Sequence, residues 1–223
     1  MSTTLIIGAS RGIGLELARQ AIAAGERVIA TARDDAGLER LRALGAQALR
    51  VDVAEPASVS GLAWQLDGEK IDTAWHVAGV MCSRADAHQP PTQAEFDRVM
   101  RTNVLGAMQV MPQVAPLVEA ARGRMAFVSS SLGLIGEAAD DHTWLYRASK
   151  AALNMVVASA QSAYPHAILV AVNPGWVRTA MGGERAPIAP QDSVAGMRRV
   201  VAALGAADRG GFFHHDGTRP VGW

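Results

Sequence analysis

The chain of 223 residues is poor in cysteine, lysine and tyrosine and has no excess of charge of either sign. Its single cysteine, Cys82, excludes a disulfide bond within the chain and fits a reducing compartment. Because 21 basic side chains balance 21 acidic ones, we expect no nucleic-acid partner and no polybasic membrane anchor. These scarcities argue against a disulfide-rich secreted domain and against a basic nucleic-acid-binding protein.

Long apolar runs and a basic leader are also missing. No run reaches the roughly 20 apolar residues that span a bilayer, so we expect no membrane segment. The first residues, MSTTLIIGAS, carry no basic side chain and lead directly into a glycine turn, which does not resemble a signal peptide. Hydrophobic residues make up 49% of the chain and charged residues 19%. Length and composition therefore predict a cytoplasmic protein with one domain, residues 1–223.

What the sequence does contain is an alternation of short apolar runs with longer segments of helical periodicity. The runs predict buried strands at residues 3–8, 27–32, 48–51, 73–78, 124–129 and 167–173. Helices are predicted at 13–25, 36–44, 58–66, 94–121 and 147–163. This order predicts an α/β fold, a single doubly wound domain with a parallel sheet between two helix layers. Residues 179–223 look less regular, although their GGFFHHDGT run is a candidate edge strand.

A glycine turn, GASRGIG, follows the first predicted strand and opens the first predicted helix. Its glycines, Gly8, Gly12 and Gly14, would let backbone approach a pyrophosphate without Cβ atoms. The helix N-terminus adds free N–H groups and partial positive charge. The spacing is slightly longer than the G-x-G-x-x-G fingerprint, and an ordinary strand-to-helix turn is the alternative. The strand–turn–helix context favours dinucleotide binding and a Rossmann-type domain.

The end of the second predicted strand bears on which dinucleotide binds. NAD sites usually place an acidic residue about 20 residues beyond the glycines. Here Ala32 is followed by Arg33, and Arg11 lies within the glycine turn. Two guanidinium groups suit a 2′-phosphate, which they can hold by charge-assisted hydrogen bonds. The neighbouring Asp34 leaves NAD open, and Arg33 could simply be solvated, but the pattern favours NADP.

Tyrosine and lysine, each present only twice, come together in YRASK, residues 146–150. Positions four apart share a face of a helix, so the Tyr146 phenol and the Lys150 ammonium can point into one site. A surface pair is the alternative.

Several motifs in order resemble those of the short-chain dehydrogenases/reductases, and the resemblance covers essentially the whole chain. It rests on GASRGIG (8–14), VDV (51–53), AG (78–79), TNVLG (102–106), VSSSLG (128–133), YRASKAALN (146–154) and NPGWVRT (173–179). The chain is most similar to the branch of the C-factor and Sniffer-like carbonyl reductases. The resemblance implies hydride transfer between NADP, with NAD still open, and a small carbonyl or alcohol substrate. A nucleotide-binding regulatory or signalling protein of the C-factor type is the alternative, and homo-oligomerisation stays open.

The resemblance also implies a role for each motif residue. Tyr146 would protonate the carbonyl oxygen. Lys150, with the charge of the oxidised nicotinamide, would lower the pKa of the phenol, and it would also hold the nicotinamide ribose. Ser130 would hydrogen-bond the substrate oxygen, and Asn103 would anchor the water of a proton relay. The implied cofactor contacts are Gly8, Ser10, Arg11, Gly12, Ile13, Gly14, Arg33, Asp52, Val53, Ala78, Gly79, Tyr146, Lys150, Pro174, Gly175, Val177 and Thr179, with no metal site. Asp52 could instead be only a turn residue.

Four positions depart from the family pattern. Ile7 replaces the threonine before the first glycine, and NNAG becomes HVAG, with His76 and Val77 in place of asparagines. Ala180 stands where the closest branch often has aspartate. None of these removes a hydride-transfer residue, so they bear on cofactor affinity more than on chemistry. We expect His76 to be packed within its strand.

The substrate pocket is predicted where chain segments leave the carboxyl ends of the strands. These segments, 79–89, 132–145 and 175–190, offer as apolar walls Met81, Leu132, Trp144, Trp176 and Met181. We therefore expect a small, mostly apolar ketone, aldehyde or quinone, with residues 182–190 as a short lid. Arg84 or Arg178, if turned inward, would instead favour an anionic substrate.

Overall fold

A parallel sheet forms the centre of the computed structural model, which describes residues 1–82 and 86–223. Within this part of the chain the sheet has seven strands in the order β3-β2-β1-β4-β5-β6-β7. The strands are β1 (Thr3–Ile7), β2 (Arg27–Ala32), β3 (Gln47–Arg50), β4 (Thr73–His76), β5 (Arg124–Val128), β6 (Ile168–Asn173) and β7 (Phe212–His214). The six predicted strands are confirmed, and the GGFFHHDGT run supplies β7 at the edge, parallel to β6.

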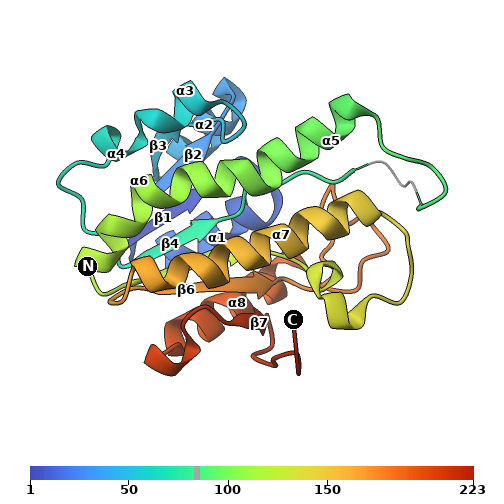
Figure 1. The fold of residues 1–223 in the computed structure, drawn as a ribbon. Helices are drawn as coiled ribbons and strands as arrows, with labels where there is room; N and C mark the ends of the chain where they lie inside the picture. Colours follow the sequence, from blue (N-terminus) through green and yellow to red (C-terminus); the bar gives the residue numbers. More distant parts are fainter. Residues whose placement is uncertain (83–85) are drawn as a thin grey trace.

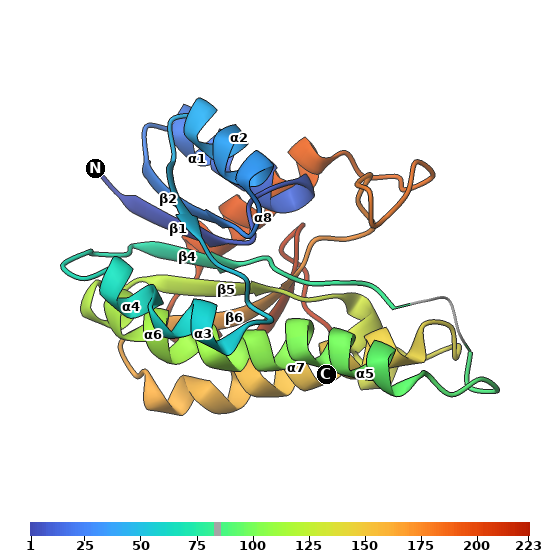
Figure 2. The same cartoon turned by 90° about the horizontal axis from the view of Figure 1, so that it is seen from above.

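The helices occupy the connections between strands and cover both faces of the sheet. They are α1 (Gly12–Ala23), α2 (Asp35–Ala43), α3 (Pro56–Ser60), α4 (Leu62–Gln65), α5 (Gln93–Met100), α6 (Gly106–Ala120), α7 (Trp144–Ala160) and α8 (Pro190–Ala203). Helices α1, α2 and α8 lie on one face, and α3, α4, α6 and α7 lie on the other (Figure 1, Figure 2). The predicted doubly wound α/β architecture is thus confirmed. Among the described residues, no helix has the length and apolar character needed to cross a membrane.

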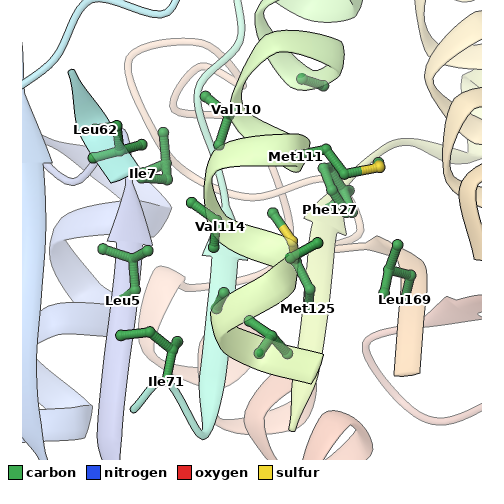
Figure 3. Close-up of a cluster of buried hydrophobic side chains, with 14 of the residues drawn as sticks. Leu5, Ile7, Leu62, Ile71, Val110, Met111, Val114, Met125, Phe127 and Leu169 are labelled. Carbon is green, nitrogen blue, oxygen red and sulfur yellow. The ribbon is translucent and has the colours of Figure 1, made fainter. Parts of the chain in front are cut away.

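The two helix layers bury two separate apolar clusters because successive strand residues point to opposite faces. In β1, Leu5 and Ile7 pack toward α6, whereas Ile6 packs toward α1 and α8. Figure 3 shows the first cluster, in which Val110 and Val114 of α6 lie over the strands. Each fully buried side chain of this size contributes about 1.5–3 kcal/mol, so the sheet is anchored from both sides.

Helix α8 contradicts the prediction of irregular structure after residue 179. Its apolar residues recur at helical spacing, and Val194, Met197 and Val201 are buried against the sheet. Pro190 in the first turn and Gly196 in the middle weaken the helical appearance of the sequence. Gly196 is required by packing, because a Cβ there would lie 2.4 Å from the backbone oxygen of His215.

Three predicted helices differ in detail. The segment 58–66 forms two short helices separated at Gly61, and the helix predicted from 147 begins at Trp144. The segment 94–121 is divided by a π-helical turn, η1 (Arg101–Leu105), between α5 and α6. This wider turn contains Asn103. π-Helical turns occur frequently at functional sites, so this turn is a candidate part of one.

Candidate active site

A cavity of about 580 Å³ opens at the carboxyl ends of the strands, where doubly wound sheets bind their ligands. In Figure 1 the segments leaving β4 and β6 lie at this end of the sheet, away from the N-terminus. The predicted contacts that line the cavity are Gly8, Ser10, Arg11, Gly12, Ile13, Arg33, Asp52, Val53, Ala78, Gly79, Tyr146, Lys150, Pro174 and Thr179. Among the predicted site residues, those that do not line it are the cofactor contacts Gly14, Gly175 and Val177 and the catalytic residues Asn103 and Ser130.

The glycine turn is fixed by backbone approaches that leave no room for side chains. A Cβ at Gly8 would lie 2.8 Å from the backbone of Ala78, and a Cβ at Gly14 would lie 2.2 Å from the oxygen of Gly8. Thr31 supports the turn, because its Oγ1 accepts a hydrogen bond of 3.0 Å from the Gly8 N–H. Thr31 on the neighbouring strand therefore provides a hydroxyl next to the turn. Ile7, which replaces the threonine of the family pattern, has no hydroxyl.

Three arginines surround one end of the cavity. Arg11 and Arg33 are exposed and line the cavity there, and so does Arg40 of α2. Arg40 was not predicted, but its Nε donates to the backbone oxygen of Ser10 at 3.1 Å, which ties α2 to the glycine turn. Asp34 also lines this end, where its carboxylate caps α2 by accepting from the Gly37 N–H at 2.7 Å. Three guanidinium groups therefore lie at this end of the cavity, and the Asp34 carboxylate there is engaged as a helix cap.

Asp52 serves as a turn residue and also faces the cavity. Its Oδ1 accepts a hydrogen bond of 3.0 Å from the Ala54 N–H, and its own N–H donates to Ser58 Oγ at 2.9 Å. Asp52 is therefore a turn residue in the cavity wall, and its predicted cofactor contact stays a prediction.

Tyr146 and Lys150 meet at the cavity from one face of α7. Both are buried, yet both line the cavity, and Lys150 Nζ lies 5.6 Å from the centre of the Tyr146 ring. Lys150 Nζ donates to the backbone oxygen of Val128 at 2.9 Å, at the end of β5. The surface-pair alternative is therefore excluded by burial.

The pKa values of this pair are governed by burial. Burial raises the pKa of Tyr146 to about 12, against a smaller opposing effect of its hydrogen bond with Ser130. Burial also lowers the pKa of Lys150 to about 8. The predicted lowering of the phenol pKa invokes Lys150 together with the charge of the oxidised nicotinamide, so it stays a prediction for the cofactor complex. In the protein alone, desolvation of the phenolate dominates the phenol pKa.

A serine–asparagine network seats α7 against the end of β5. Ser129 Oγ donates to Asn154 Oδ1 at 2.5 Å, and Asn154 Nδ2 donates to the Gly133 oxygen at 3.2 Å. A Cβ at Gly133 would lie 2.7 Å from the backbone of Lys150, so a side chain there would push α7 away. The side chain of Ser130 points away from that of Ser129, as alternation along an extended chain predicts, and it hydrogen-bonds with Tyr146.

Asn103 connects η1 to both sides of the site. Its Oδ1 accepts from the Val80 N–H at 2.8 Å, and its Nδ2 donates to the Val80 oxygen at 2.9 Å and to Ser149 Oγ at 3.0 Å. Ser149 Oγ in turn donates to the backbone oxygen of Tyr146 at 2.7 Å. The Asn103 carboxamide thus holds the segment after β4 next to α7. Ser149, which the sequence analysis missed, is the link.

The predicted substrate walls are present in part. Met81 and Met181 line the cavity, whereas Trp144 and Trp176 are exposed and do not line it. Leu132 packs in a small apolar cluster that includes Tyr146. The predicted lid, residues 182–190, is bonded to the segment before it, because the Arg178 N–H donates to the Ile188 oxygen at 2.9 Å.

Charge near the substrate end comes from an arginine that the sequence analysis did not consider. Arg98 of α5 lines the cavity, and its Nη2 donates to the Met81 oxygen at 2.9 Å. Arg178 does not line the cavity, and its Nη1 donates to the Ala186 oxygen at 3.3 Å. Arg84 lies outside the described residues.

His76 is packed inside the sheet layer, as predicted. It is 1% exposed and stacks on Phe127 with ring centres 5.5 Å apart. Its Nε2 has no hydrogen-bond partner among the described residues. Burial, aided by the charge of Lys150, lowers the His76 pKa from 6.5 to about 3.

Replacement of His76 by asparagine is expected to change how stability depends on pH. In the parent, the folded-state pKa of about 3 lies below the ordinary value of 6.5. The unfolded chain therefore binds an extra proton between these limits, and stability falls as pH decreases through this window. One proton corresponds to on the order of 1 kcal/mol per pH unit. Denaturant unfolding of both proteins at pH 4–7 measures this, and the exposed His166→Asn serves as control. Equal slopes for the parent and His76→Asn would contradict the assignment.

Comparison with known proteins places the chain. The family model described as short chain dehydrogenase matches residues 2–188. The C-signal of Myxococcus xanthus is 37% identical over 150 residues, which cover 66% of this chain and 87% of that protein. The structure of the Drosophila melanogaster carbonyl reductase Sniffer matches with a TM-score of 0.91 and 26% identity over 100% of both chains. A Burkholderia multivorans short-chain dehydrogenase/reductase with bound NADP matches with a TM-score of 0.89 and 30% identity, over 100% of this chain and 99% of that one.

The chain therefore belongs to the short-chain dehydrogenase family of oxidoreductases. Within it, the chain falls with the C-factor and Sniffer-like carbonyl reductases, as the motifs predicted.

Proposed function

We propose that this protein is an NADPH-dependent oxidoreductase that reduces a small, mostly apolar ketone, aldehyde or quinone, with residues 1–223 acting as one domain. The observation that carries the proposal is the meeting of Tyr146 and Lys150 in one cavity with the glycine turn. The approaches at Gly8 and Gly14 support a dinucleotide there, because they leave backbone N–H groups uncovered by side chains beside the cavity. When bound, NADPH supplies the hydride that reaches the carbonyl carbon.

The residues of the chain complete the reduction. Tyr146 donates its phenolic proton to the carbonyl oxygen, so that the hydride and the proton together give an alcohol. Ser130, which is hydrogen-bonded with Tyr146, orients the same oxygen. Because its pKa is about 8, Lys150 carries a proton at pH 7 and stabilises the phenolate that remains. Asn103 acts through Val80 and Ser149 by positioning them, and its predicted role in holding a relay water stays a prediction.

Preference for NADP over NAD is proposed to reside in the end of the cavity where the three guanidinium groups lie. Arg11, Arg33 and Arg40 can surround a 2′-phosphate, while the Asp34 carboxylate is occupied as a helix cap. The similar Burkholderia multivorans protein with bound NADP supports this choice.

Steady-state oxidation of NADPH and NADH with a panel of neutral ketones, aldehydes and quinones tests the proposal. We expect substrate-dependent oxidation that is faster with NADPH. Tight NADPH binding without any such oxidation, unchanged by Tyr146→Phe, would instead favour a nucleotide-binding regulatory protein. The similarity to the C-signal is the observation that supports this second function.

The charge of the substrate gives a separate prediction. We expect higher kcat/KM for neutral carbonyl compounds than for matched carboxylates, because Met81 and Met181 line the substrate end and Arg98 is directed to a backbone oxygen. The measurement is a ranking of matched pairs by kcat/KM for the parent, Arg98→Ala and Arg178→Ala. A preference for carboxylates that either substitution abolishes would overturn the apolar pocket.

A further inference from the structure

The family model ends at residue 188, and the chain beyond it packs on the loop that leaves β6. This loop begins at Asn173, Pro174 and Gly175, and Pro174 lines the cavity together with Tyr146 and Lys150. His214 of β7 contacts Asn173, Ser193 of α8 contacts Pro174, and His215, which follows β7, lies next to Gly175. The segment after residue 188 therefore determines where the loop lies.

The side chain of Asn173 stands at the centre of these contacts. Its Oδ1 accepts a hydrogen bond of 3.1 Å from the Gly175 N–H, and its Nδ2 lies 2.9 Å from Nδ1 of His214 in β7. The Gly175 N–H can only donate, so the amide oxygen must face it. The amide nitrogen must then donate to His214, which requires Nδ1 to be an unprotonated acceptor. The loop thus fixes the tautomer of His214.

Two more contacts complete the hold on the loop. The His215 N–H donates to the Asn173 oxygen at 2.9 Å, and Ser193 Oγ of α8 donates to the Pro174 oxygen at 2.7 Å. Gly175 has a φ of +77°, and a Cβ there would lie 2.5 Å from Ile188 Cδ1 and 3.1 Å from the His215 ring. These contacts enclose the loop, and in the Asn173–His214 contact the acceptor is a ring nitrogen of histidine.

We propose that His214 is a positioning residue for the nicotinamide end of the cofactor site, acting through Asn173 and the Pro174–Gly175 loop. This inference rests on the proposed NADPH site. The sheet order separates β2, which ends near Arg33, from β6 by three intervening strands. Parallel strands lie about 4.8 Å apart, so the two ends of the cavity are roughly 19 Å from each other. Loss of the His214 contact therefore affects the half of the site next to Tyr146. It leaves unchanged the arginine half, which is lined by Arg11, Arg33 and Arg40.

The ring of His214 also packs edge-on against Phe212, with ring centres 5.5 Å apart, so packing supports its position next to Asn173.

The test compares two ligands in direct binding titrations. NADPH fills both halves of the site, whereas adenosine 2′,5′-bisphosphate lacks the nicotinamide and fills only the arginine half. His214→Phe keeps a ring but removes the acceptor, and it is expected to weaken NADPH binding about tenfold without weakening adenosine 2′,5′-bisphosphate. His214→Asn places an oxygen near the position of Nδ1 and is expected to restore NADPH binding. The exposed His166→Phe is the matched control.

Asn173→Ala keeps the proposal testable should His214→Phe not fold, because it removes the same contact from the side of the loop. It is expected to weaken NADPH binding without weakening adenosine 2′,5′-bisphosphate. The proposal is overturned if His214→Phe or Asn173→Ala binds NADPH like the parent, or if both ligands weaken equally. Failure of the parent to bind either ligand would overturn the proposed function itself.

Discussion

Replacing Tyr146 with phenylalanine is expected to lower turnover at least about 100-fold and to leave NADPH affinity within about twofold of the parent. The reason is that phenylalanine keeps the buried ring in the cavity wall but has no proton to give to the carbonyl oxygen. Since burial raises the Tyr146 pKa to about 12, the phenol holds its proton throughout the neutral range and is ready to act as an acid. Single-turnover rates and a binding titration separate the two effects.

The chain offers a matched control for this substitution. Its other tyrosine, Tyr164, packs against the apolar cluster under α6 and does not line the cavity. Tyr164→Phe is therefore expected to keep the parental rate. Unchanged turnover in Tyr146→Phe would remove Tyr146 from the mechanism.

Replacing Arg33 with alanine is expected to weaken NADPH binding by about 1.5–3 kcal/mol, or about 10- to 150-fold, because a charge-assisted contact to the 2′-phosphate is lost. NADH has no 2′-phosphate and is expected to lose little. Arg11→Ala should act in the same direction, and Arg40→Ala tests the arginine that the sequence did not suggest. Affinities for both cofactors, measured for each variant, give the result.

Arg42 supplies the control, because it lies on the same helix as Arg40 but does not line the cavity. Arg42→Ala is expected to bind both cofactors like the parent. Equal weakening of NADPH and NADH by Arg33→Ala, or a parental preference for NADH, would show that the 2′-phosphate assignment is wrong.

Most of the fold is predictable from the sequence because its strands are short, apolar on both faces and separated by helical segments. The parallel strands β1, β2 and β4–β6 were predicted almost to their ends for this reason. Helix α8 was missed because Pro190 and Gly196 resemble loop residues. The need for Gly196 comes from the approach of His215, just after β7, so it could not be inferred from the local sequence pattern.

The candidate site, like the fold, could be predicted only in part from the sequence. Tyr146, Lys150 and the glycine turn could be found from their spacing, and the cavity brings them together. Arg40 and Ser149 could not be found, because their importance comes from contacts with segments far away in the sequence. The burial that raises the pKa of Tyr146 in the protein alone could not be predicted, since spacing shows that Lys150 is near but does not show how deeply the phenol is buried.

The central claim is that the chain transfers hydride from NADPH to a carbonyl carbon, and transfer of deuterium tests it most directly. The parent protein is mixed with NADPH carrying deuterium at the reactive carbon of the nicotinamide, together with the most active neutral ketone or aldehyde of the panel. The account predicts an alcohol that is one mass unit heavier, with the deuterium on the former carbonyl carbon. It also predicts that Tyr146→Phe, with NADPH bound, forms this product at least about 100-fold more slowly. Bound NADPH with no labelled alcohol from any carbonyl compound tested would contradict the account.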